Sequence, residues 1–213
     1  MNFSSAKSQI LFSVFAQIFR FGAPILFYPI LIRTLTTADF AAFVLYMAAG
    51  QTIGQFTEFG FGLSAVRGIN NLSKDSSARA LITGEVLLGK FMMFSLTSII
   101  FVTGVIIYQS ILNGENLLIL APIMIGFAYG FTPNWFYIGI GKAHQLAFIE
   151  IIVSMAQLTL VLFFVSASHG VISAVIAITL PVMALSIIGK IHTVRKLGFI
   201  KPTFSRLVSA TQT

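Results

Sequence analysis

The sequence predicts an all-α integral membrane protein, a polytopic bundle of about six transmembrane helices. Three observations indicate this class: 57% of the 213 residues are hydrophobic, only 9% are charged, and the mean hydropathy is +0.95. Soluble domains carry about 25% charged residues, so these charges are too few to cover a water-soluble globule of this size. The apolar side chains, including 22 Phe, are therefore expected to face lipid or each other.

Six stretches are long enough to cross a bilayer, which takes roughly 20 mostly apolar residues in a helix. They cover residues 9–32, 40–65, 86–108, 117–139, 146–166 and 171–189. The first is too long for the core of a signal peptide and no small-residue cleavage site follows it, so we interpret it as a retained helix. The longest connector, 68–85, is expected to hold a short interfacial helix around 77–82. The six helices form one predicted domain over 1–191, and 192–213 is a basic cytoplasmic tail or linker.

The distribution of Lys and Arg predicts how the helices are oriented. With the N-terminus in the cytoplasm, Arg33 falls outside, Arg20 falls within the membrane, and the other 11 of the 13 basic residues fall on the cytoplasmic side. Cytoplasmic loops of membrane proteins collect Lys and Arg. Both termini are therefore predicted to be cytoplasmic, and the net charge of +7 indicates topology rather than binding to nucleic acid.

Two pairs of glycines have the spacing that lets helix backbones approach closely in lipid. They are Gly50 with Gly54, and Gly126 with Gly130. Because Gly is also simply common in membrane helices, the spacing leaves close packing and chance equally open.

Polar residues gather on one face of three predicted helices and indicate a polar interior. Spacings of three and four residues place side chains on a single helical face. The first, second and fifth helices are therefore predicted to line this interior, whereas the third and sixth face lipid more. The residues on these faces are Gln9, Ser13, Gln17, Arg20, Pro24 and Tyr28 in the first helix, Gln51, Gln55, Glu58 and Gly62 in the second, and Glu150, Ser154 and Gln157 in the fifth.

Three ionisable residues, Arg20, Glu58 and Glu150, fall between the middle of the membrane and its inner face. An Arg at mid-membrane costs about 2.5–3.5 kcal/mol on insertion scales, so Arg20 needs a partner or a water-filled cavity. A structural ion pair with Glu58 and a cationic site for an anionic substrate are both open, and the two can coexist.

Three further residues fall near the inner ends of the third and fourth helices. Lys90 is expected to extend its ammonium group to the nearby interface. Trp135 and Tyr137 are expected to anchor the fourth helix at the interface rather than to form a platform for a substrate.

No catalytic or metal-binding motif is visible in the sequence. The chain has no Cys, which excludes disulfides and thiolate metal sites. The three His fall in connectors or the tail, and no HExxH, carboxylate pair or phosphate-binding Gly loop occurs. The chain is therefore expected to be neither an enzyme nor a metalloprotein, and to use no cofactor.

The ends of the second and fourth helices carry two recognisable segments, EFGFGLSAVR over 58–67 and PNWFYIGIGK over 133–142. Both resemble signatures of the bacterial polysaccharide exporters, the O-antigen flippases of the multidrug/oligosaccharidyl-lipid/polysaccharide superfamily. The first resembles an acidic-FGFG-x-S-A-x-R stretch and the second a P-x-WF-x-x-G stretch that ends in a basic residue. Ile138 stands where the family often has Gln. The resemblance implies a twelve-helix transporter of two six-helix lobes, of which this chain would hold one.

The resemblance also implies a function: flipping undecaprenyl-pyrophosphate-linked oligosaccharide repeat units across the bacterial inner membrane for O-antigen or other surface polysaccharide synthesis. Arg20 would then contact the pyrophosphate, and Glu58 would pair with Arg20 or act as a proton or ion site. The glutamines would bind sugar hydroxyls, and proton or sodium coupling is open. The candidate substrate-binding residues are Arg20, Gln17, Gln51, Gln55, Glu58 and Glu150.

Two other classes of function stay open. One is an ion-coupled multidrug exporter of the same superfamily, with Glu58 as its cation site. The other is an inactive lobe or a scaffold for a glycan-assembly complex. The expected partners are a lipid-linked oligosaccharide and membrane lipids, and further candidates are a second lobe, a second copy of the chain, a polysaccharide polymerase and chain-length machinery.

Overall fold

The computed structural model describes residues 22, 24–71, 76–112, 120–165 and 170–200, and every regular element in that part of the chain is an α-helix. A first helix covers Pro24–Thr34. The helices that follow are α2 (Thr37–Glu58), α3 (Phe61–Asn71), α4 (Ser76–Leu112), α5 (Leu120–Gly130), α6 (Asn134–Gly139), α7 (Ala143–Phe164) and α8 (Gly170–Leu197). The predicted all-α bundle is confirmed.

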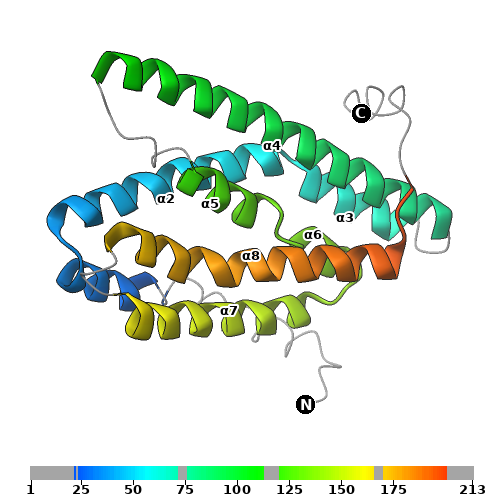
Figure 1. The fold of residues 1–213 in the computed structure, drawn as a ribbon. Helices are drawn as coiled ribbons and strands as arrows, with labels where there is room; N and C mark the ends of the chain where they lie inside the picture. The colour runs from blue at the N-terminus through cyan, green and yellow to red at the C-terminus, as the bar shows by residue number, and fades with distance from the viewer. Residues whose placement is uncertain (1–21, 23, 72–75, 113–119, 166–169, 201–213) are drawn as a thin grey trace.

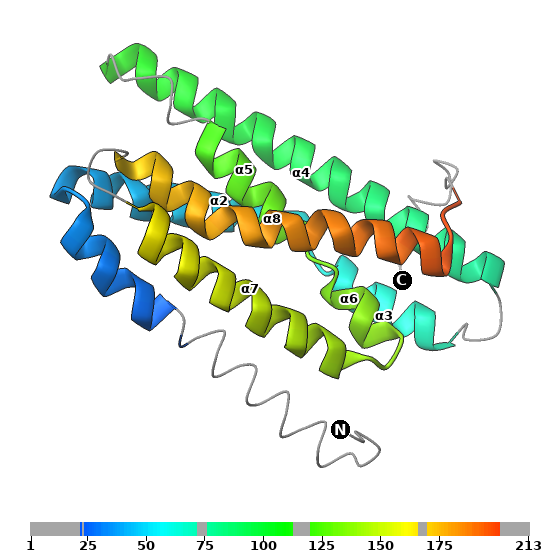
Figure 2. The same cartoon turned by 60° about the horizontal axis from the view of Figure 1, so that its bottom comes forward.

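The helices pack side by side with α8 in the middle of the bundle (Figure 1). Helix α8 contacts α2, α4, α5 and α7, while α4 lies along the outside (Figure 2). The prediction that the sixth helix mainly faces lipid is therefore wrong. In the most apolar stretch of α8, 44% of the residues are buried, against 28% in that of α7 and 6% in that of α4. Its small side chains explain this central place, because they let four neighbours approach it.

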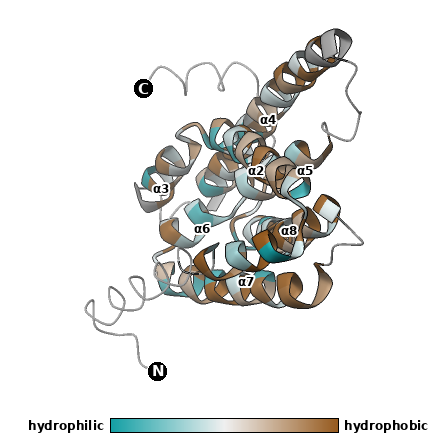
Figure 3. Cartoon of the chain, turned by 90° about the vertical axis from the view of Figure 1, so that its left-hand side faces the viewer, coloured by the Kyte–Doolittle hydropathy of each residue, from teal (hydrophilic) through white to brown (hydrophobic). Residues whose placement is uncertain are grey.

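Three of the described helices are long and apolar enough to cross a membrane by length and composition, namely α4 over Ser77–Ile107, α7 and α8. Their outward faces are strongly apolar (Figure 3). On α4 the exposed side chains include Phe91, Leu96, Ile99 and Ile100. Exposed apolar surface of this extent is unfavourable in water, whereas in lipid it is the expected outer surface of a bundle. The structure thus agrees with a membrane protein.

Two of the predicted spans are interrupted at the point where the resemblance motifs begin. The second ends as α2 at Glu58 and resumes as α3 after a turn at Gly60, whose φ of +79° favours glycine. The fourth ends as α5 at Gly130 and resumes as α6 after Pro133. The two broken helices run beside each other, because α2 contacts α5 and α3 contacts α6.

Helix boundaries differ from the prediction at the end of the bundle where most of the described Lys and Arg residues lie, namely at the end of α3, the start of α4 and the end of α8. The connector 68–85 is not an extended loop with a separate interfacial helix, because α3 reaches Asn71 and α4 starts at Ser76 as one continuous helix. Similarly, α8 continues to Leu197, so the first residues of the predicted tail over 192–213 are helical. Hydropathy ends a span where charge begins, but a helix can continue as a helix beyond the hydrocarbon.

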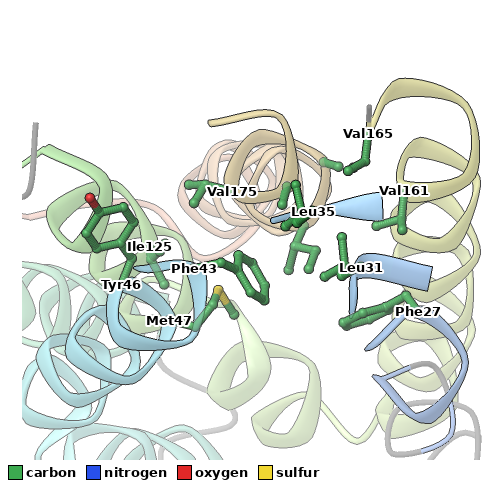
Figure 4. Packing of buried hydrophobic residues seen from close by; sticks show 13 residues of the cluster. Phe27, Leu31, Leu35, Phe43, Tyr46, Met47, Ile125, Val161, Val165 and Val175 are labelled. Atoms are coloured by element: carbon green, nitrogen blue, oxygen red, sulfur yellow. The ribbon is translucent and has the colours of Figure 1, made fainter. Parts of the chain in front are cut away.

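The larger core cluster lies between the first helix, α2, α5, α7 and α8 (Figure 4). Phe43 and Leu31 are fully buried there, and Val161 and Ile178 are 1% exposed. Because each of the surrounding helices contributes a side chain to this cluster, it fixes their relative positions at the end of the bundle opposite α3 and α6.

The two glycine pairs form the contact between α2 and α5, which confirms close packing. A Cβ on Gly126 would lie 2.6 Å from Ile53 Cγ2, and a Cβ on Gly130 would lie 2.7 Å from Thr57 Cβ. A Cβ on Gly54 would lie 3.2 Å from the backbone nitrogen of Gly130. Since these distances are shorter than ordinary carbon contacts of about 3.5–4.0 Å, the helices approach as closely as they do because the side chains are absent.

Candidate functional site

A half-open cavity of about 580 Å³ lies among the helices of the bundle, and residues of the first helix, α2, α5, α6, α7 and α8 line it together with the α5–α6 turn. Its polar lining residues are Gln51, Gln55, Glu58, Thr132, Asn134, Glu150, Ser154 and Gln157. Pro24, Phe27, Gly54, Tyr129, Val153, Val182 and Leu185 complete the wall. A volume of this size is typical of a pocket for a small molecule or for the headgroup of a larger one.

Four of the six candidate residues meet at this cavity. Gln51, Gln55 and Glu58 come from one face of α2, and Glu150 comes from α7 on the other side. The spacing of four and three residues on α2 produces this alignment, as the sequence indicates. The other two candidates, Arg20 and Gln17, lie outside the described residues.

The cavity also has lining residues that the sequence analysis did not select. Thr132 and Asn134 flank Pro133 in the turn between α5 and α6, and Tyr129 precedes them on α5. Val182 and Leu185 come from α8, which was expected to face lipid. The available signal was Pro133, because a proline inside an apolar span interrupts the helix and exposes backbone and polar side chains at that depth.

Glu58 forms an ion pair with Lys90 of α4. The Lys90 side chain is 1% exposed, so the prediction that it extends to the interface is wrong. Its ammonium group instead turns inward, because a carboxylate and a helix end lie within reach on that side. Glu58 is 38% exposed and lies between Lys90 and the cavity. The expected alternative partner of Glu58, Arg20, is outside the described residues, so that pairing stays a prediction.

The last carbonyls of α5 receive hydrogen bonds from side chains. Ser186 Oγ of α8 donates to the Ala128 carbonyl at 2.6 Å, and Lys90 Nζ donates to the Gly130 carbonyl at 3.2 Å. Thr132 Oγ1 donates to the Tyr129 carbonyl at 3.2 Å. Carbonyls in the last turn of a helix have no partner within the helix, and Pro133, four residues after Tyr129, has no N–H to offer. These side chains therefore stabilise the break beside the cavity.

On the opposite wall, Gln157 of α7 donates from Nε2 to the Ile178 carbonyl of α8 at 2.8 Å. Gln157 and Ser154 are both 7% exposed. The polar face of the fifth predicted helix is thus directed inward, as expected, but Gln157 also joins two helices. A hydrogen bond of this kind is favourable in lipid, where water cannot replace it.

Trp135 and Tyr137 are buried rather than placed at the membrane surface. Their exposed fractions are 3% and 7%, and they belong to a second core cluster formed with α3, α4, α7 and α8. The Tyr137 ring stacks on His192 of α8, with the ring centroids 6.4 Å apart. The prediction that they anchor the fourth helix at the interface is therefore wrong, because the break at Pro133 turns α6 into the bundle.

A second ammonium group lies near Lys90. Lys190 Nζ of α8 is 4.2 Å from the centroid of the Phe131 ring and 5.3 Å from that of Phe127. The negative face of an aromatic ring attracts a cation in this position. The positive charges of Lys90 and Lys190 repel each other, so both need the negative groups and ring faces around them.

The site can bind a polar group within an apolar bundle. Among the described residues, no group of three or more His, Cys, Asp or Glu is placed to hold a metal ion. The cavity offers amides, hydroxyls and two carboxylates, of which Glu58 is neutralised by Lys90. Amides and hydroxyls at this depth can hydrogen-bond to the hydroxyl groups of a sugar.

Comparison with known proteins adds two findings. A protein family described as "Polysaccharide biosynthesis protein" matches residues 6–212. A protein of Escherichia coli (strain K12), described as "Putative O-antigen transporter", is 25% identical over 169 residues. That match covers 78% of this chain but 40% of the relative, so the chain spans less than half the length of that protein. No solved structure matches the chain significantly.

The family match extends over nearly the whole chain, including both broken helices and all the residues that line the cavity. This all-α membrane bundle therefore belongs to the polysaccharide biosynthesis protein family.

Proposed function

We propose that this chain is one six-helix lobe of a transporter that flips lipid-linked oligosaccharide repeat units across the bacterial inner membrane. The observation that carries the proposal is the cavity, in which Gln51, Gln55, Glu58 and Glu150 converge inside an otherwise apolar bundle. Family membership and the similarity to the putative O-antigen transporter of Escherichia coli support the substrate class. The chain acts in this proposal as a transporter and not as an enzyme.

The sugar headgroup would lie against the amides and hydroxyls of the cavity, while the lipid chain stays in the membrane. Gln51 and Gln55 would donate and accept hydrogen bonds with sugar hydroxyls, replacing the water that the headgroup loses. Arg20 would bind the pyrophosphate, since guanidinium groups bind phosphate oxygens in a bidentate manner. The partner lobe, whether part of a longer chain or a second copy, would complete the cavity and permit alternating access.

We propose that both termini are cytoplasmic. Arg67 of α3, Arg79 of α4 and Lys196 of α8 support this orientation, because the segments that carry them meet at one end of the bundle. Helix α3 contacts α4 there, and the Ile200 N–H, beyond the end of α8, donates to the Ala80 carbonyl of α4 at 3.2 Å. Basic residues mark the cytoplasmic side of membrane proteins.

The proposal is tested by complementing a bacterial strain that cannot export O-antigen. The strain receives either this chain alone or a full-length transporter in which this chain forms one lobe. Gln55→Leu in the full-length context should reduce surface polysaccharide at least tenfold while the protein still accumulates in the membrane. The matched control is Thr159→Leu on the same bundle. Thr159 is exposed on α7, its hydroxyl binds only the Met155 carbonyl of its own helix, and it does not line the cavity. Normal export by Gln55→Leu, or equal loss in both variants, would contradict a role for the cavity in substrate binding.

The Arg20 contact has its own test in the same assay. Arg20→Ala should abolish export without loss of protein, and Arg20→Lys should restore only part of it, because Lys cannot bind phosphate in a bidentate manner. Resistance to cationic drugs, with normal surface polysaccharide, would instead favour the ion-coupled multidrug exporter. That alternative draws less support from the structure, because Lys90 already lies beside the Glu58 carboxylate.

A further inference from the structure

We propose that the ends of two broken helices form a binding site for a primary ammonium group. The side chain of Lys90 supplies the ammonium group that fills this site. The site consists of the Glu58 carboxylate at the end of α2 and the Gly130 carbonyl at the end of α5. Lys90 enters it from a third helix, α4, and so acts as a positioning residue that holds both ends and orients Glu58 toward the cavity. This role is independent of which molecule is transported.

One buried ammonium group lies beside the last residue of each of two broken helices. Lys90 Nζ pairs with the carboxylate of Glu58, which ends α2, and donates to the carbonyl of Gly130, which ends α5. The carbonyl end of a helix carries a partial negative charge equivalent to roughly half an elementary charge. The site therefore combines the full negative charge of Glu58 with the partial negative charge at the end of α5, which is more than a simple ion pair provides.

Placing the Lys90 ammonium group at this point is costly. The side chain is 1% exposed, and a buried ammonium group is tolerated only when it is paired and hydrogen-bonded. The Lys190 ammonium adds repulsion rather than relief. Since Glu58 is itself partly open to the cavity, the hydrogen bond from Lys90 to the Gly130 carbonyl supplies part of the compensation.

The break after α5 leaves carbonyls that need a hydrogen-bond donor, because Pro133 has no N–H to offer. Thr132 and Ser186 satisfy two carbonyls of α5. The Gly130 carbonyl is left to Lys90. A cation at this point thus joins α2, α4 and α5 at the level where the cavity has its Glu58 wall.

Chemical rescue tests the proposal on the purified full chain in detergent. Lys90→Ala removes the equivalent of n-propylammonium from the side chain, and we expect the variant to melt at a lower temperature than the parent. Adding n-propylammonium should raise its melting temperature saturably by more than about 2 °C, which is roughly the effect of 0.5–1 kcal/mol for a chain of this size. The parent protein should not respond, because its own ammonium group fills the site.

Two controls separate charge from volume. The neutral analogue n-propanol should not rescue Lys90→Ala, and n-propylammonium should rescue Lys90→Ala combined with Glu58→Gln much less. Equal rescue by propanol would show that only volume matters and would overturn the proposal. A folded Lys90→Ala that responds to no amine would overturn it as well.

If Lys90→Ala cannot be purified, accumulation in the membrane gives a second measurement. Fluorescent fusions of Lys90→Arg and Lys90→Met should differ in their level in the membrane. The Arg variant should accumulate to at least twice the level of the Met variant, because Arg keeps the cation whereas Met keeps only the length of the side chain. Met is the better tolerated residue in lipid if the position is merely packed. A level of Met equal to or above that of Arg would contradict the ammonium site. Neither measurement depends on transport, so either can fail while the proposed function stands.

Discussion

The close approach of α2 and α5 predicts that a single methyl group on Gly50 will destabilise the bundle. A Cβ at this position would contact Ile125 Cβ closely and would lie 2.8 Å from the carbonyl oxygen of Pro122. The second contact is with backbone, which cannot rotate away. The two helices must therefore move apart at their tightest point.

The expected size follows from two opposing effects. Replacing Gly by Ala in a helix gains about 1 kcal/mol from intrinsic preference. Overfilling a packed contact costs typically 1–3 kcal/mol, and the backbone contact at Gly50 places it at the upper end of that range. The net effect is a loss of about 1–2 kcal/mol, which lowers the melting temperature of a chain of this length by roughly 2–8 °C.

Thermal melting of the purified chain in detergent measures this effect, with Gly104→Ala as the matched control. Gly104 lies on α4, and a Cβ there would meet nothing within 4 Å. Only the gain in helix preference applies, so Gly104→Ala should melt at or slightly above the parent temperature. Ile125→Ala should not rescue Gly50→Ala, because Ala retains the Cβ that the new methyl group meets. If Gly50→Ala melts at or above the parent temperature, the close packing inferred for α2 and α5 is refuted.

Two more predictions use the same protein. Ser186→Ala removes the donor to the buried Ala128 carbonyl, so it should cost about 1–3 kcal/mol in a melting experiment, and an equally large loss in Thr159→Ala would show that the contact is not the cause. Because the chain has no Cys, single cysteines can be placed freely. In permeabilised membranes a charged thiol reagent should label Gln55→Cys in the cavity but not Ile100→Cys on the lipid side of α4. The reason is that thiols ionise, and so react, only in contact with water. Labelling of Ile100→Cys at the same rate would refute the assigned lipid face.

The periodic part of the fold could be predicted from the sequence because hydropathy and helical spacing act locally. The spacing of Gln51, Gln55 and Glu58 places them on one face of α2, and the structure directs that face into the cavity. The same holds for Ser154 and Gln157 on α7. These predictions need only the helix period and the high cost of placing polar groups in lipid.

The errors concern residues whose position depends on a break or on a partner far away in the sequence. Lys90 looks like an interfacial lysine when its helix is considered alone, and only the ends of α2 and α5 draw it inward. Trp135 and Tyr137 look like interfacial anchors until Pro133 turns α6 into the bundle. Hydropathy contains no information on such contacts, because it averages over the break and ignores all other helices.

The motif at the end of the second helix has a physical explanation in this structure. Glu58 ends α2 at the cavity, and Gly60 supplies the left-handed turn that starts α3. Phe61 then packs over Gly89 of α4, where a Cβ would lie 2.5 Å from Cε1 of the ring. A side chain at Gly62 would displace the Glu58 carboxylate, because a Cβ there would lie 2.6 Å from Glu58 Oε1.

Gly62 therefore leaves space for the Glu58 carboxylate, while Gly89 of α4, outside the motif, leaves space for the Phe61 ring. The space at Gly62 lets the Glu58 carboxylate fold back beside the turn, where it meets Lys90. The acidic residue, the glycines and the phenylalanine of the motif thus form one unit that ends a helix at the depth of the cavity. A motif of this kind reports the position of a helix break, and through it the position of the polar site, which is why it can accompany a transport function without any residue of it performing catalysis.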